Sequence, residues 1–166
     1  MKPDTIYEEH VFSKWSTIVL ATVTIALLFV LVYQLLVGPI GTRPAPNWVL
    51  LTMFLLFLAI MVPFITLIIK ITPQQISVGY GIIKHAMAWE NVADCYPDMT
   101  SVVRYGGWGI RLGRVGGRWR LVYNVIGSPR LVLLLKEGKF KEFVFSIRDA
   151  EEVARVVKQR IGKMAV

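Results

Sequence analysis

Two long uncharged stretches decide the fold of this chain: STIVLATVTIALLFVLVYQLLV, from Ser16 to Val37, and WVLLTMFLLFLAIMVPFITLII, from Trp48 to Ile69. Neither contains Asp, Glu, Lys, Arg or His. A helix of about 22 residues is about 33 Å long, which matches a hydrocarbon core about 30 Å thick. A tryptophan stands at the start of each stretch (Trp15 and Trp48), where aromatic rings favour the membrane interface. The sequence therefore predicts two transmembrane helices, 16–37 and 48–69.

The segment between these stretches, residues 38–47 (GPIGTRPAPN), is rich in proline and glycine. This composition breaks helices and predicts a short extracytoplasmic loop, so the two helices should form a hairpin. Pro63 lies inside the second stretch and should kink it. A cleaved signal peptide is disfavoured for the first stretch, because the stretch is too long and its preceding tail is acidic.

The charge of the chain, +8 at pH 7, is concentrated after the second stretch. Lys14 precedes the first span and Lys70 follows the second, whereas the loop carries Arg43 alone. Because cytoplasmic flanks carry the excess of Lys and Arg, this pattern predicts a multi-pass plasma-membrane protein with both termini cytoplasmic. The spans contain scattered threonines but no charge, which favours an anchor or assembly surface over an ion pathway. We expect those threonines to pack or to bond backbone carbonyls.

The tail, residues 1–15, has a helical pattern. Thr5 and Glu8 match a capping box, and Tyr7, Val11 and Trp15 follow at a spacing of four. The pattern predicts a short helix. Two interpretations stay open: a helix lying in the headgroup region, or an extension of the first span.

Residues 70–166 change to a strand pattern. Seven short segments rich in Val, Ile and aromatic residues predict a small antiparallel sandwich or barrel. They are ISVGY, IIKHAMAW, SVVRY, WGIRLGR, RWRLVY, RLVLLL and EFVFSI. A final helix is expected at about 149–161, with Ser146 or Asp149 at its start and Gly162 at its end. Its apolar face should cover the open end of the barrel.

One β-hairpin can be worked out in detail. Gly116-Gly117 predicts a two-residue turn, which sets Arg114 opposite Trp119 and separates two faces. One face is apolar and comprises Ile110, Leu112, Trp119, Leu121 and Tyr123. The other face gathers three arginines, Arg111, Arg118 and Arg120.

Two interpretations of the arginine face stay open. It is either a solvated outer surface that prevents aggregation or a site for anionic lipid headgroups. A nucleic-acid site is disfavoured, because Trp119 lies on the apolar face rather than beside the arginines.

No catalytic, cofactor or metal site emerges from the residues. The single cysteine, Cys95, has no mark of activation, and His85 lies in a strand pattern without a serine or cysteine motif. Asp94 and Asp98 bracket a turn-like Tyr96-Pro97 but lack further metal ligands. We therefore expect a protein that is not an enzyme and that holds no cofactor.

The order of elements, together with the segments WENV, GGWGIR, YNVIGSPRLVLLL and FVFSI, resembles prokaryotic membrane proteins with a PH-like domain after a transmembrane hairpin. The resemblance implies an all-β PH-like domain: a bent, seven-stranded antiparallel sheet capped by one C-terminal helix. It does not imply phosphoinositide binding, since the first strand pair, ISVGYGIIKH, carries only Lys84 and His85. PH-like folds often serve as docking platforms, although a fold does not fix a function.

The leading hypothesis is a non-enzymatic, membrane-anchored module that docks a protein partner or is an assembly subunit of a membrane complex, with another protein or a second copy as its partner. Anionic lipid binding through the arginine face is the alternative, and an unrecognised enzyme is the third possibility.

Overall fold

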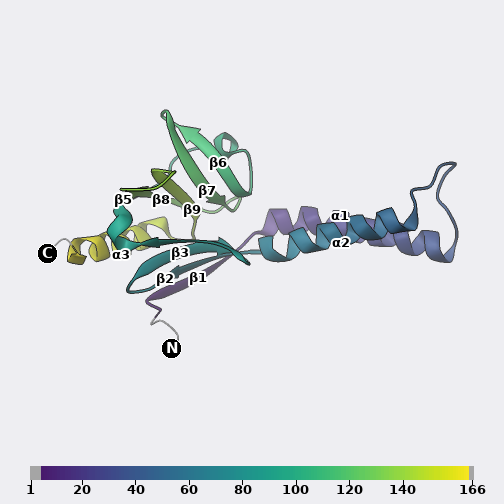
Figure 1. The fold of residues 1–166 in the computed structure, drawn as a ribbon, viewed down its shortest axis with the longest axis horizontal. Coiled ribbons are helices and arrows are strands. Elements are labelled where there is room, and N and C mark those ends of the chain that lie inside the picture. Colours follow the sequence, from purple (N-terminus) through teal and green to yellow (C-terminus); the bar gives the residue numbers. More distant parts are fainter. Residues whose placement is uncertain (1–4, 165–166) are drawn as a thin grey trace. The chain divides into compact units, whose positions relative to one another are not determined.

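The computed structural model describes residues 5–164, without the side chains of Val102, Val103 and Met164. The chain forms two compact units (Figure 1). One unit is the helical hairpin from Lys14 to Ile65. The other unit, here called the β domain, combines the segment that precedes the hairpin with the whole chain from Thr66 onward.

The hairpin consists of two packed helices, α1 (Lys14–Leu36) and α2 (Asn47–Phe64, with Pro63 in its last turn). Both are long and apolar enough to cross a membrane. Three threonine hydroxyls donate to the carbonyl four residues earlier, as expected: Thr22 to Ile18 at 2.9 Å, Thr24 to Leu20 at 2.7 Å and Thr52 to Trp48 at 2.7 Å. These bonds satisfy the hydroxyls within the helix, so each helix presents a nearly apolar surface.

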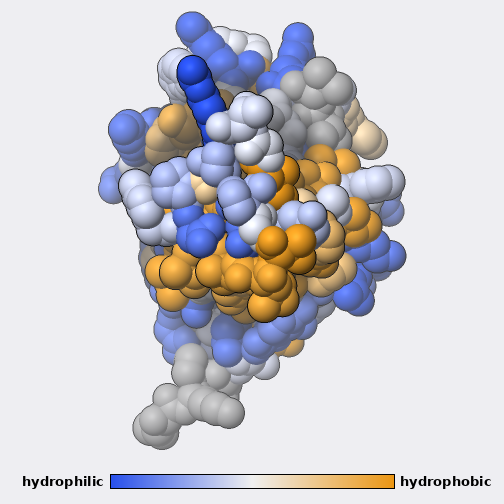
Figure 2. All heavy atoms as spheres, turned by 90° about the vertical axis from the view of Figure 1, so that its right-hand side faces the viewer, coloured by the Kyte–Doolittle hydropathy of each residue, from blue (hydrophilic) through white to orange (hydrophobic). Residues whose placement is uncertain are grey.

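The surface of the hairpin is covered by large hydrophobic side chains, most of them outward-facing. Figure 2 shows hydrophobic residues (orange) gathered in a broad patch. An exposed apolar surface this large is costly in water and is normal in lipid.

The second apolar stretch ends as a helix earlier than expected. Helix α2 stops at Phe64, and Thr66–Ile71 forms strand β2 instead of continuing a span to Ile69. Leu67, Ile69 and Ile71 are buried on alternate positions of this strand. An uncharged run of this kind looks the same to a hydropathy argument whether it enters lipid or a protein core.

The tail is a strand over residues 7–12, where the predicted helix is wrong; the helix begins at Lys14. Tyr7–Phe12 forms β1, which pairs antiparallel with β2 from Tyr7 opposite Ile71 to Phe12 opposite Thr66. Glu9 of β1 is buried and accepts a hydrogen bond from the Arg148 backbone N–H at 3.0 Å. Pairing with a distant strand overrides the local capping pattern.

Two sheets make up the β domain. The first is an antiparallel meander, β1-β2-β3-β4, completed by β3 (Gln75–Tyr80) and β4 (Ile83–Ala88). The second has the order β5-β8-β9-β7-β6. Its strands are β5 (Val92–Pro97), β6 (Gly109–Val115), β7 (Arg118–Asn124), β8 (Arg130–Leu135) and β9 (Glu142–Ser146).

The expected seven-stranded antiparallel sheet is therefore wrong in two respects. The described chain has nine strands in two sheets, and β7 and β9 run parallel. Segment SVVRY is not a strand but the short 3-10 helix η2 (Val102–Tyr105), while the expected turn around Tyr96-Pro97 belongs to β5. A second 3-10 helix, η1 (Trp89–Asn91), joins the sheets.

The main core lies between the two sheets. Tyr80 of β3 stacks on Tyr123 of β7 with ring centroids 6.1 Å apart, and His85 of β4 stacks on Phe143 of β9 at 5.2 Å. Helix α3 (Ala150–Met164) buries Val153 and packs against β5. The helix is capped as predicted, because the Asp149 carboxylate accepts the Glu152 backbone N–H at 2.8 Å. It continues past Gly162, contrary to the prediction.

Candidate functional site

The hairpin that carries the three predicted site arginines has the predicted register. Arg114 pairs with Trp119, Leu112 with Leu121 and Ile110 with Tyr123. Gly116 and Gly117 form the turn with φ of 58° and 82°, values that favour glycine. The local sequence was sufficient for the register because turn chemistry alone fixes it.

The orientation of the two faces is opposite to the expectation near the tip of this hairpin. The arginine-bearing face turns inward, where Gly113 and Val122 are buried against Tyr105 of η2. The apolar face is buried at its base, at Tyr123, but at its tip Leu112 and Trp119 are 59% and 53% exposed. The segment that covers the arginine face comes from residues 98–105, which the hairpin sequence cannot reveal.

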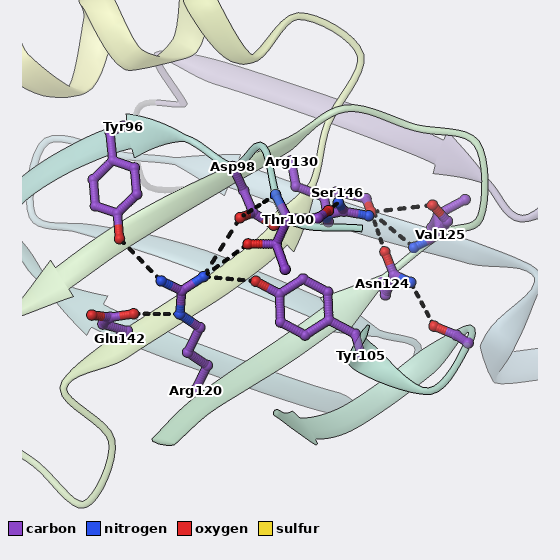
Figure 3. A network of polar contacts seen from close by, with 11 residues as sticks. Tyr96, Asp98, Thr100, Tyr105, Arg120, Asn124, Val125, Arg130, Glu142 and Ser146 are labelled. Carbon is purple, nitrogen blue, oxygen red and sulfur yellow. Dashed lines mark hydrogen bonds and ion pairs between the residues drawn. The ribbon is translucent and has the colours of Figure 1, made fainter. Parts of the chain in front are cut away.

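Arg120 is the centre of a buried polar network (Figure 3). Its guanidinium forms an ion pair with Glu142 on the neighbouring strand β9. It also donates to the Tyr105 hydroxyl at 2.8 Å and the Tyr96 hydroxyl at 3.3 Å, and lies 3.5 Å from Asp98. With so many partners inside the protein, Arg120 is not available to a lipid headgroup, and this part of the prediction is wrong.

A second arginine completes the network. Arg130 Nε donates to Asp98 at 2.9 Å, and its guanidinium lies over the Tyr105 ring at 5.3 Å. Burial opposes the charged form of Asp98, but hydrogen bonds from Thr100 and Arg130 outweigh it and hold the pKa of this carboxyl below its usual value. Two buried arginines thus balance two buried carboxylates, a structural arrangement that fixes the 98–105 segment over the sheet.

The other two predicted arginines lie outside this network's core. Arg118 is 69% exposed and reaches Glu142 at 3.4 Å, while Arg111 is exposed and donates from Nε to the Trp108 carbonyl at 3.1 Å. The three arginines therefore do not form one continuous solvent-facing surface.

The structure reveals a different positive surface, which we call the basic groove. It is a hollow of about 560 Å³ with an apolar floor and a cationic rim. The floor comprises Ala93, Leu134 and Leu135, and the rim comprises Arg118, Trp119, Lys136, Lys139 and Lys141. Sequence reasoning missed it, although the lysine-rich segment 136–141 (KEGKFK) was a visible signal.

The residues considered for catalysis have environments typical of a core. Cys95 is buried, donates to the Ala154 carbonyl at 3.5 Å, and has a thiol pKa raised by burial to about 11. Burial lowers the pKa of His85, which stacks on Phe143. Within residues 5–164, no three His, Cys, Asp or Glu side chains cluster as metal ligands would. A buried thiol with a raised pKa is a poor nucleophile.

Comparison with known proteins found no matching family model, no matching curated protein and no matching solved structure. The resemblance to membrane proteins with PH-like domains stays a prediction.

Proposed function

We propose that this protein is a non-enzymatic, membrane-anchored docking module that presents its β domain to a protein partner on the cytoplasmic side of the plasma membrane. One observation carries the proposal: the helical hairpin is inserted between β1 and β2, two strands that pair directly with each other. The β domain is therefore joined to the apolar helices twice, through β1 and through β2.

The connections between the hairpin and the β domain are short in the sequence. Phe12 and Thr66 are paired residues, while α1 begins at Lys14 and α2 ends at Phe64. No linker long enough to act as a flexible tether separates the sheet from either helix. A domain joined in this way stays beside the bilayer.

The same pairing supports a common side for the tail and the β domain. An open sheet cannot form across a bilayer, because its backbone groups would be unsatisfied in the hydrocarbon. Lys14 and Lys70 flank the hairpin at its sheet end, and Arg43 alone lies in its loop. The excess of positive charge at the sheet end favours the cytoplasm.

Docking rather than catalysis is supported by the surface of the β domain. Leu112 and Trp119 are apolar and exposed, and Trp119 lines the basic groove. Exposed aromatic residues of this kind often act as anchors in protein interfaces.

Cysteine accessibility tests the anchoring. In a Cys95→Ser background, single substitutions Arg43→Cys in the loop and Gln159→Cys on α3 are labelled with a membrane-impermeant maleimide. We expect the loop position to react in intact cells and the α3 position only after permeabilisation, with the protein retained in membranes after alkaline carbonate extraction. Reaction of both positions from the same side, or release into the aqueous fraction, would contradict the proposal.

Cross-linking in native membranes tests the docking. The wild-type chain should give a discrete higher-mass species that is lost in Leu112→Ser/Trp119→Ser and kept in a control with Arg155→Ser and Gln159→Ser on α3. A chain that stays monomeric at every cross-linker concentration would contradict a docking role.

A further inference from the structure

We infer that the basic groove binds an acidic peptide segment of a protein partner, with one apolar side chain of that segment held on the groove floor beside Trp119. This inference rests on the proposed docking function and specifies the chemistry of the partner.

The groove exists because β9 is shorter than its neighbours. Strand β9 begins at Glu142, which lies opposite Arg120 on β7 and Leu134 on β8. Just before it, the Lys141 carbonyl accepts the Leu135 backbone N–H at 2.8 Å. Strand β7 extends two residues further, to Arg118, and β8 one further, to Leu135. Between these ends the chain turns back through residues 136–141. The short β9 leaves a hollow whose floor is formed by Leu134 and Leu135 of β8 and Ala93 of β5.

The rim of the groove carries an excess of positive charge. Lys136, Lys139 and Lys141 make no ion pair with a carboxylate in the described part of the chain. Lys141 donates instead to the Lys136 carbonyl at 2.7 Å, which holds two of these residues together. Arg118 shares Glu142 with Arg120, so the carboxylate is already occupied by the buried pair. A rim with four cations and no carboxylate of its own attracts a negatively charged ligand.

The floor determines which class of anion fits best. Leu134, Leu135 and the Trp119 indole offer an apolar surface that a phosphate group would leave uncovered. A peptide with Leu or Phe flanked by Asp or Glu covers the floor and pairs with the rim at the same time. The Arg114 guanidinium lies 5.8 Å from the centre of the Trp119 ring and supports its orientation. This combination favours an acidic peptide over a lipid headgroup.

A peptide selection tests the inference on the full chain. The protein is held in nanodiscs of neutral phosphatidylcholine and used to select from a display library of random twelve-residue peptides. We expect enrichment of peptides in which Asp or Glu flank an aromatic or aliphatic residue. Affinity of a selected peptide should fall about tenfold or more in Trp119→Ala and in the triple reversal Lys136→Glu/Lys139→Glu/Lys141→Glu.

The matched control reverses three exposed cations on α3: Arg155→Glu, Lys158→Glu and Lys163→Glu. This variant has the same net charge as the groove variant and should keep the affinity. Equal loss in both triple variants, or a selection without acidic enrichment, would overturn the inference.

A second experiment tests whether anionic lipid, rather than an acidic peptide, binds the basic groove. The indole N–H signal of Trp119, assigned by its loss in Trp119→Phe, is followed by NMR in neutral nanodiscs and in nanodiscs containing phosphatidylglycerol. We expect the selected peptide to shift this signal in neutral nanodiscs. A shift on anionic lipid with no acidic peptide selected would assign the groove to lipid and overturn the inference. A failure of the proposed anchoring would be seen in a different measurement, as release of the protein from membranes by alkaline carbonate.

Discussion

At the scale of single residues, the decisive feature is where two chemically identical arginines lie. Arg120 and Arg111 belong to the same face of the same hairpin, yet Arg120 is buried among five polar side chains while Arg111 is exposed. A buried charge whose partner is removed costs about 3–5 kcal/mol, whereas an exposed one contributes little. The role of a charged residue on a strand therefore cannot be assigned until the segment that covers that strand is known.

This contrast predicts opposite outcomes for one substitution. Arg120→Met leaves the buried Glu142 with the exposed Arg118 as its remaining ion-pair partner, removes a buried partner of Asp98, and should lower the free energy of unfolding of the β domain by about 3 kcal/mol. Arg111→Met, the matched control, should change it by less than about 0.5 kcal/mol. Chemical denaturation in non-ionic detergent, followed by tryptophan fluorescence, measures both. Equal effects of the two substitutions would place Arg120 at the surface.

Asp98 predicts a pH dependence of stability with a definite sign. Its pKa in the folded protein is lowered, so its contribution to stability is full above the pKa of the unfolded chain, about 3.9. That contribution is lost as the pH falls through the folded value. The stability difference between the wild type and Asp98→Asn should therefore be largest near pH 7 and shrink below about pH 4. Denaturation midpoints at pH 7, 5, 4 and 3 measure it, and a constant difference would contradict the role of the carboxylate.

At the scale of elements, the sequence predicts a helix or strand correctly where the residues that stabilise it are close by in the sequence. Helices α1, α2 and α3 and the β6–β7 register follow from local apolar runs, a cap and a Gly-Gly turn. Strand β1 pairs with β2, which follows the helical hairpin in the sequence, and Gly113 packs against Tyr105. Local patterns therefore mislead at both places. The burial of Arg120 was missed for the same reason, since its partners Glu142 and Asp98 are also distant in the sequence.

Two glycines predict opposite effects of one added methyl group. A Cβ on Gly113 would lie 2.7 Å from Cδ1 of Tyr105, so Gly113→Ala should cost about 1–3 kcal/mol of stability through overpacking. Gly162 lies within α3 with open space around it, so Gly162→Ala should stabilise by about 0.5–1 kcal/mol. Thermal denaturation of the two variants in detergent should shift in opposite directions. A stabilised Gly113→Ala would show that η2 does not press on the sheet.

At the scale of the whole molecule, the chain combines two units by inserting one into the other. The helical hairpin interrupts the β domain between two adjacent strands, and the domain recruits the chain on both sides of the interruption. The first sheet therefore needs residues from before and after the hairpin. Folding of the β domain requires β1 to meet β2 after the hairpin between them has been accommodated, which couples anchoring to the completion of the sheet.

This insertion predicts that the hairpin can be removed without loss of the β domain. Phe12 and Thr66 are antiparallel partners, about 5 Å apart, so replacing residues 13–65 by Asn-Gly should close β1 and β2 with a two-residue turn. The shortened chain should be monodisperse without detergent and show dispersed amide NMR signals, because it lacks the apolar surface of the hairpin and keeps the complete sheet. A chain starting at Thr66 lacks β1, leaves β2 as an unpaired apolar edge, and should aggregate. If the chain that starts at Thr66 were as soluble and as stable as the Asn-Gly variant, β1 would not be an integral strand. The anchor would then be attached to the domain through β2 alone.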